Sequence, residues 1–132
     1  MKSFILFILI SSVLFAQEYQ MHDPNAQVNA TTEVNFQIDK YYPVFGTSEK
    51  PFENSLQIRF TAVEGDYTAY FNFGGKYTPP RLDYKSKILY FNYPESYYNY
   101  LIDRLKEETA YIVYREYKDG HKWGEIYFDK YP

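Results

Sequence analysis

The sequence of 132 residues contains no cysteine, only two histidines and no run of basic residues. Without cysteine the chain has no disulfide bonds, no thiol nucleophile, no thiolate ligands for zinc and no N-terminal cysteine for lipid attachment. Its interior must therefore be held together by burial alone. The sequence also lacks a phosphate-binding glycine loop and the acidic spacing of a calcium loop. We therefore expect no cofactor and no metal site.

Charge of one sign is not concentrated anywhere along the chain. There are 14 lysine and arginine residues and 17 aspartate and glutamate residues, which gives a net charge of -3. A protein that binds the phosphate backbone of nucleic acid needs a basic surface, and no lysine or arginine cluster supplies one. The composition therefore predicts no nucleic-acid partner.

Aromatic residues, in contrast, are abundant. They make up 22% of the chain, with 17 tyrosines and 11 phenylalanines. Both amino acids have AT-rich codons, so a biased genome can raise their number without selection for binding. Alternatively, tyrosine builds adaptable recognition surfaces at a low cost in conformational entropy. Composition favours neither explanation over the other.

The N-terminal residues have the pattern of a secretory signal peptide. Lys2 precedes an apolar run from Phe4 to Phe15, and the small residue Ala16 suits a cleavage site. The run is too short to span a bilayer comfortably, so we expect no stable membrane span after cleavage. The large Leu14 near the cut leaves an uncleaved anchor as the alternative. The pattern predicts a secreted or periplasmic protein.

After residues 1–16, we expect a flexible lead-in over 17–31 and a single β-rich domain over 32–132. Alternation of apolar and polar residues predicts β-strands at 32–40, 55–62, 67–73, 88–93, 111–118 and 121–128. Between the strands predicted at 88–93 and 111–118, the spacing of apolar residues predicts an amphipathic helix over 94–107. Its apolar stripe consists of Tyr98, Leu101, Ile102 and Leu105.

These elements predict an α+β fold that is mostly β. We expect a single antiparallel sheet of about six strands, twisted or partly rolled, in the order β-β-β-β-α-β-β, with the helix packed on it.

Asp119-Gly120 lies between two alternating runs, which is the pattern of a hairpin with a two-residue turn, because such turns need positive φ. This turn would place Tyr114 opposite Glu125. One face of the hairpin would then carry Tyr114, Glu116, Trp123, Glu125 and Tyr127. The other face would carry the apolar residues Tyr111, Val113, Ile126 and Phe128.

An earlier hairpin is expected to turn at Glu64-Gly65. Pairing across this turn places Phe60 opposite Ala69, and every apolar residue of both strands then lies on one face. The opposite face is expected to be solvated and carries Gln57, Arg59, Thr61, Thr68, Tyr70 and Asn72.

The ring-rich face of the later hairpin is the candidate binding site. Its three rings would form a platform, with the carboxylates of Glu116 and Glu125 as hydrogen-bond acceptors. Such a surface suits a sugar or a protein partner. The structural alternative is that the helix covers this face and packs against Trp123.

Three functions are compatible with these features. The leading hypothesis is a small exported non-enzymatic binding module for a protein or a glycan, which includes inhibitor and immunity-type proteins. The second is a small exported glycan hydrolase, because Glu116 and Glu125 flanked by rings are the groups that glycoside hydrolysis uses. The third is a structural subunit of an envelope or extracellular assembly, joined through exposed strand edges.

Overall fold

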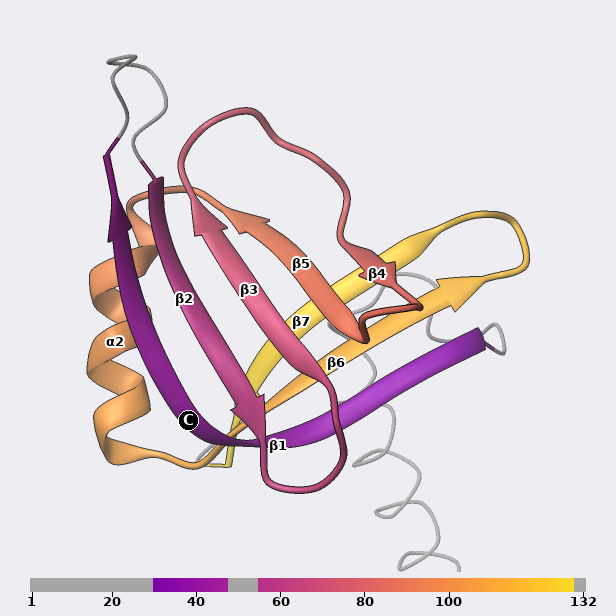
Figure 1. Ribbon diagram of the computed structural model, residues 1–132, viewed down its shortest axis with the longest axis horizontal. Helices are drawn as coiled ribbons and strands as arrows, with labels where there is room; N and C mark the ends of the chain where they lie inside the picture. The colour runs from indigo at the N-terminus through magenta and orange to yellow at the C-terminus, as the bar shows by residue number, and fades with distance from the viewer. Residues whose placement is uncertain (1–29, 48–54, 130–132) are drawn as a thin grey trace, which may run out of the picture. The chain divides into compact units, whose positions relative to one another are not determined.

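The computed structural model describes residues 30–47 and 55–129, which form a curled sheet of seven strands and one helix (Figure 1). The expected signal peptide and nearly all of the lead-in lie outside these residues. The strands are β1 (Ala30–Gly46), β2 (Ser55–Ala62), β3 (Thr68–Phe73), β4 (Arg81–Asp83), β5 (Ile88–Tyr93), β6 (Ala110–Tyr117) and β7 (Lys122–Phe128), and the helix is α2 (Tyr97–Glu107).

The strands lie in the order β4-β5-β3-β2-β1-β6-β7. The expected mostly β fold with one helix and a rolled sheet is confirmed, but the sheet is mixed and has seven strands, so a purely antiparallel sheet of six is wrong. The difference arises because β5 lies between β3 and β4 and runs parallel to β3. Pro79 and Pro80 have no backbone N–H, so the segment before β4 cannot continue a ladder beside β3.

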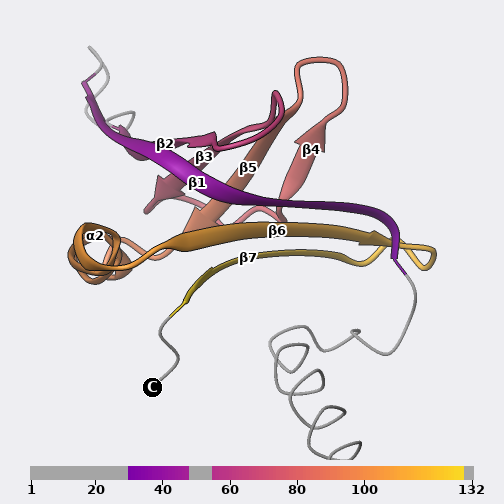
Figure 2. The same ribbon diagram turned by 90° about the horizontal axis from the view of Figure 1, so that it is seen from below.

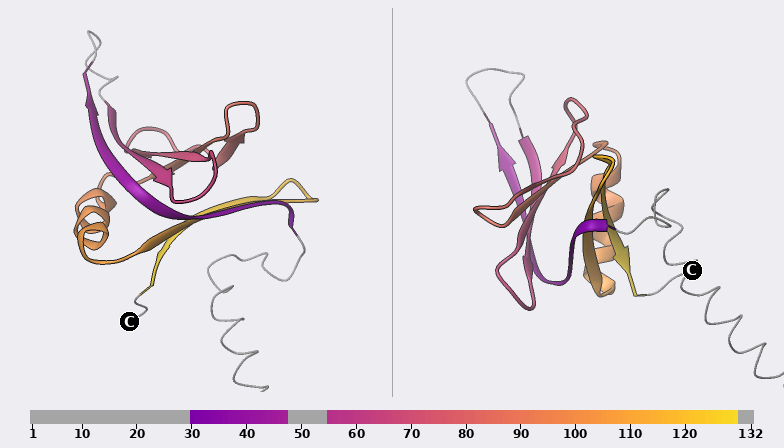
Figure 3. Two further views of the ribbon diagram at one scale, coloured as in Figure 1. Left: turned by 60° about the horizontal axis from the view of Figure 1, so that its bottom comes forward. Right: turned by 90° about the vertical axis from the view of Figure 1, so that its right-hand side faces the viewer.

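β1 is longer than expected and belongs to two parts of the sheet. Its first half lies beside β6, and Thr31 Oγ1 donates a hydrogen bond to the backbone oxygen of Glu116 at 3.0 Å. From Ile38 onward it pairs with β2, and the register of this pairing shifts between Ile38 and Lys40. Figures 2 and 3 show the strand curving from one part to the other.

The strand predicted at 32–40 continues through residues 41–46, although these include Pro43 and Gly46. Pro43 pairs with Ile58 of β2. In Figure 1 β2 is the only described strand beside the second half of β1, so β1 is an edge of the described sheet there. An edge tolerates proline because the missing N–H needs no partner strand.

The hydrophobic core lies between the two parts of the curled sheet. The five-stranded part consists of β4, β5, β3, β2 and the second half of β1, and the three-stranded part consists of the first half of β1 with β6 and β7. The core includes Ile58, Phe60, Phe71, Leu89 and Phe91 from the first part and Val34, Phe36, Ile112, Tyr114 and Phe128 from the second. The predicted helical stripe is confirmed, since Leu101 and Leu105 of α2 are buried in the same core.

The predicted register of the β2–β3 hairpin is confirmed. Phe60 lies opposite Ala69, and Leu56 lies opposite Phe73. Alternation therefore assigned the inner and outer faces of both strands correctly.

The register of the β6–β7 hairpin differs from the prediction by one residue. Tyr114 lies opposite Gly124, not Glu125. The N–H of Tyr117 donates to the backbone oxygen of His121 at 2.9 Å, so residues 118–120 form the loop. The N–H of Gly120 donates to the oxygen of Tyr117 at 2.9 Å, and Gly120 has a φ of +90°. This is a three-residue hairpin with glycine in the left-handed position, rather than a two-residue turn.

Replacing Gly120 with alanine is expected to lower the free energy of unfolding by about 1 kcal/mol, because a Cβ disfavours positive φ. The cost is conformational, since a Cβ at this position would have nothing within 4 Å. Asparagine tolerates this region better, so Gly120→Asn should cost less. Urea denaturation measures both, with Lys118→Ala in the same loop as the control. An equal or larger loss for Gly120→Asn would contradict this explanation.

Candidate functional site

The change of register separates the five residues of the predicted platform. Tyr114 and Glu116 lie on the same face of the hairpin as Gly124, toward the core. Trp123, Glu125 and Tyr127 lie on the opposite face, because successive residues of a strand point to opposite sides. The prediction that these five side chains share one face is therefore wrong.

Glu116 accepts hydrogen bonds from two tyrosines. The hydroxyl of Tyr114, which has no exposed surface, donates to Glu116 Oε1 at 2.6 Å. The hydroxyl of Tyr84, from the turn between β4 and β5, donates to Glu116 Oε2 and lies 3.4 Å from Thr32 Oγ1. We call these four residues the Glu116 network. It links β1, β6 and the β4–β5 turn, so it joins the two parts of the sheet.

The network holds its carboxylate charged and its tyrosines neutral. Burial alone would raise the pKa of Glu116, but the hydrogen bonds from Tyr114 and Tyr84, with the positive charge of Lys122, outweigh burial and lower this pKa. Burial, followed by the hydrogen bond to Glu116, raises the pKa of Tyr114. This arrangement is that of a structural acceptor whose oxygens are occupied.

Glu116 and Glu125 cannot act as a pair on one glycosidic bond. A glycosidase places its two carboxyl groups on either side of the scissile bond in one cleft. Here the two residues point to opposite faces of the hairpin. The carboxylate pair proposed from the sequence is therefore wrong.

The other face of the hairpin carries its own rings. Tyr111 and Tyr127 stack with their ring centres 5.0 Å apart. Trp123 lies near His121, with ring centres 6.5 Å apart, and its indole nitrogen is buried without a hydrogen-bond partner in the described part of the chain. Trp123 is next to the β6–β7 turn, whereas α2 lies at the opposite end of the hairpin (Figures 1 and 2). The alternative that the helix covers Trp123 is therefore also wrong.

A row of tyrosine and arginine side chains crosses the outer face of the five-stranded part. Cross-strand pairing places its members side by side, one from each strand, in the order Tyr42, Arg59, Tyr70, Tyr90 and Arg81. We call these five residues the tyrosine–arginine row. The alternation of the sequence predicted a solvated face for Arg59 and Tyr70 but gave no signal for the row.

The members of the row contact one another. The guanidinium carbon of Arg59 lies 4.8 Å from the ring centre of Tyr42. The rings of Tyr70 and Tyr90 are stacked, with centres 5.9 Å apart and planes at 15°. The guanidinium carbon of Arg81 lies 3.9 Å from the ring centre of Tyr90. Stacking fixes the orientation of the guanidinium groups, so their N–H donors and the tyrosine hydroxyls are arranged in advance of any ligand.

A second row of polar side chains runs beside the first. Gln57, Asn72 and Asn92 are cross-strand neighbours on the same outer face. Gln57 Nε2 donates to Asn72 Oδ1 at 2.6 Å, and Asn92 Nδ2 donates to the backbone oxygen of Thr78 at 3.2 Å. An amide carries two donors and an acceptor with two lone pairs, so each retains capacity for a ligand.

An open pocket of about 410 Å³ lies at one end of both rows. Its lining includes Asn72, Thr78, Arg81, Tyr90, Asn92 and Lys122. Arg81 belongs to β4 and Lys122 to β7, the two edge strands, so the curl of the sheet brings its edges together at this pocket. We call it the edge pocket.

Among the described residues, the lining of the edge pocket has two cations and no carboxylate. In the described part of the chain, neither Arg81 nor Lys122 forms an ion pair within 4 Å. Two acids interact with them at longer range. The charge of Arg81 contributes to a lowered pKa of Asp83, after the hydrogen bonds from Ser86 and Lys85. Lys122 acts in the same direction on Glu116.

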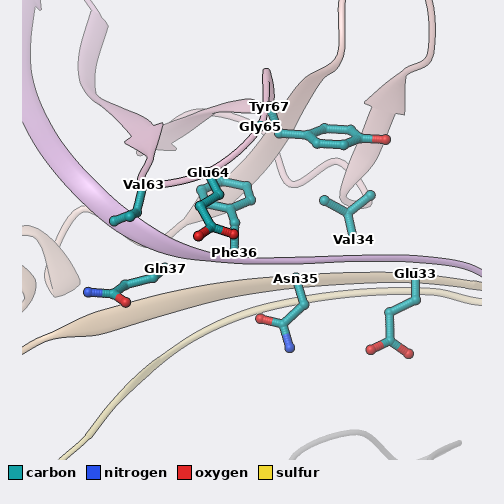
Figure 4. Close-up of a pocket in the computed structure, with 9 residues that line it drawn as sticks. All are labelled: Glu33, Val34, Asn35, Phe36, Gln37, Val63, Glu64, Gly65 and Tyr67. Carbon is teal, nitrogen blue, oxygen red and sulfur yellow. The ribbon is translucent and has the colours of Figure 1, made fainter.

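A larger open pocket, of about 570 Å³, lies between β1 and the β2–β3 turn. Figure 4 shows Val34 and Phe36 pointing toward this turn, with the ring of Tyr67 above Val34, whereas Glu33 and Asn35 point to the other side of β1. The carboxylate of Glu33 lies 3.5 Å from Arg115 Nε. The lining of this pocket thus combines the core side chains of Val34 and Phe36 with the polar residues Glu33, Asn35, Gln37 and Glu64.

Within residues 30–47 and 55–129, no group of three or more His, Asp or Glu side chains is placed to hold a metal ion. No helix in that part of the chain has the length and apolar character needed to cross a membrane.

A comparison of the chain with known protein families finds no match. Comparisons with curated proteins and with solved structures find none either.

Proposed function

We propose that this chain is a small exported binding module, not an enzyme, and that it recognises a carbohydrate through the tyrosine–arginine row and the adjacent amide row. The signal-peptide pattern of residues 1–16 supports export. The observation that carries the proposal is the register that aligns one tyrosine or arginine from each of five strands.

The chemistry of this face favours a carbohydrate over a protein. It displays hydroxyl, amide and guanidinium groups, which pair with sugar hydroxyls as donors and acceptors. Tyrosine and arginine also anchor protein interfaces, but the core of such an interface is apolar, and every member of the two rows on this face carries a polar group. Neighbouring strands are about 4.8 Å apart, so the row is roughly 19 Å long. That length suits a linear chain of several sugars.

The other two functions have less support. A hydrolase would need a new acid and base, because Glu116 and Glu125 face opposite sides of their hairpin. Assembly through strand edges would have to use β7, which has seven residues, or the second half of β1, because the edge strand β4 has only three residues.

Replacing Tyr70 with alanine is expected to weaken polysaccharide binding about tenfold, which corresponds to about 1.4 kcal/mol, because it breaks the row at its centre. A panel of soluble neutral and acidic polysaccharides, tested by affinity electrophoresis and then calorimetry, measures this effect. Tyr97→Ala is the matched control, since Tyr97 is a 54% exposed tyrosine on α2, outside the row. Absence of binding across the panel, or equal losses for both variants, would overturn the proposal.

A further inference from the structure

We infer that the carbohydrate is acidic, and that one carboxylate or sulfate group on it occupies the edge pocket between Arg81 and Lys122. This inference rests on the proposed function, because the edge pocket is the end of the same outer face.

The charge of the edge pocket is the first argument. The chain as a whole is acidic, with a net charge of -3, yet the described residues that line the pocket include two cations and no carboxylate. The two acids that interact with those cations at longer range already accept other hydrogen bonds. Asp83 Oδ1 accepts from the N–H of Lys85 at 3.1 Å and from that of Ser86 at 3.3 Å, and both oxygens of Glu116 accept from tyrosines.

The geometry of Arg81 is the second argument. Its guanidinium group lies against the ring of Tyr90, 3.9 Å from the ring centre, so it is held flat. A guanidinium group in a fixed plane presents parallel N–H donors that match the two oxygens of a carboxylate or the oxygens of a sulfate. Lys122 approaches from the other edge strand and adds a point charge. An anionic substituent would therefore lie between two donors on separate strands.

The neighbouring groups fit a sugar that carries such an anion. Asn72 and Asn92 line the same pocket. Asn72 keeps its amide N–H donors for sugar hydroxyl groups, and Asn92, whose amide nitrogen donates to Thr78, keeps its Oδ1 acceptor. Tyr90 belongs both to the pocket and to the row, so a chain whose acidic unit lies in the pocket can continue along the row.

The test compares matched pairs of polymers with the full chain. Polygalacturonate is compared with its methyl ester, and dextran sulfate with dextran, at low and high salt. We expect at least one anionic polymer to bind about tenfold or more tightly than its neutral counterpart, with the difference reduced at high salt. Preference for only one pair supports the inference and identifies the anion as carboxylate or sulfate.

Variants assign the preference to the pocket. Lys122→Gln, outside both rows, is expected to weaken binding of the acidic polymer about tenfold while leaving any binding of the neutral polymer unchanged. Arg81→Gln, which also alters the row, is expected to weaken binding of the acidic polymer about tenfold more than binding of the neutral polymer. Lys87→Gln is the control, because Lys87 does not line the pocket. Its amino group lies 3.5 Å from the carboxylate of Asp66, with which it forms an ion pair. Thermal unfolding of each variant checks that the fold is retained.

Two negative results have different meanings. If acidic and neutral polymers bind equally, or if neither pocket variant changes binding, the inference is overturned while the proposed function stands. If no polysaccharide binds to the unaltered protein, the proposed function itself is overturned, and the inference with it.

Discussion

Replacing Gly124 with alanine is expected to lower the free energy of unfolding by about 1–3 kcal/mol, because it overpacks the contact between the two parts of the sheet. A Cβ on Gly124 would lie 2.6 Å from Cε1 and 2.7 Å from Cζ of Phe91. Phe91 is only 2% exposed, and its ring centre lies 5.0 Å from that of Phe71 and 6.5 Å from that of Tyr114. Its ring therefore has no free space into which to move.

A double-mutant cycle tests this explanation. Phe91→Leu removes the atoms that the new methyl group would meet, so Gly124→Ala should cost less in the Phe91→Leu background than in the unaltered protein. Urea denaturation of the four proteins gives the interaction energy. If the two costs simply add, the close approach of Gly124 to Phe91 is not the reason for the destabilisation. Backbone strain does not offer another reason, since Gly124 is not among the residues with positive φ.

Replacing Glu116 with alanine is expected to lower the free energy of unfolding by about 2–3 kcal/mol, because it leaves the buried hydroxyl of Tyr114 without its charged acceptor. Tyr84→Phe removes the hydrogen bond from the Tyr84 hydroxyl to Glu116 and should cost less than about 1 kcal/mol. Tyr84 is 59% exposed, so water can replace its hydroxyl as the donor to Glu116. Urea denaturation compares the two variants. Equal losses would mean that burial of Tyr114 is not what gives Glu116 its importance.

The same network predicts a dependence of stability on pH. The pKa of Glu116 is lower in the folded protein than its ordinary value of 4.5. Its contribution is therefore present above pH 4.5 and is lost as the pH falls through the folded value. The pKa of Tyr114 is raised above 10.0, so its contribution is present below pH 10 and is lost as the pH rises through the folded value.

Denaturation midpoints measured across pH check both signs. Glu116→Gln should be less stable near neutral pH but should lose less stability on acidification than the unaltered protein. Tyr114→Phe should lose less stability on the alkaline side. Curves that run parallel to that of the unaltered protein on the acidic or the alkaline side would contradict the assignment of that loss to Glu116 or Tyr114, respectively.

Local pattern predicted the parts of the fold that depend on local burial. The β2–β3 hairpin has its expected register because every apolar residue of the two strands favours one face, as in the pair of Phe60 and Ala69. The helix was predicted for the same reason. In the β6–β7 hairpin both faces carry rings, so burial did not select between registers, and the assignment rested on the length of the turn alone.

The candidate site could not be predicted in the same way because it depends on the order of the strands. Tyr70 and Tyr90 are neighbours only because β5 lies next to β3, with β4 displaced to the edge. A simple succession of hairpins would have placed β4 beside β3 instead. The three residues of β4 are too few to show a period, so the sequence offered no signal for the strand that carries Arg81.

The position of β1 has a consequence for how the chain folds. The hydrogen bond from Thr31 to Glu116 spans 85 residues, whereas the strands from β2 to β5 pair with partners nearby in the sequence. Contacts between distant residues form late because closing a long loop costs entropy before any pairing repays it. We therefore expect the five-stranded part to assemble early and the docking of β6 and β7 against β1 to be the slow step that completes the core.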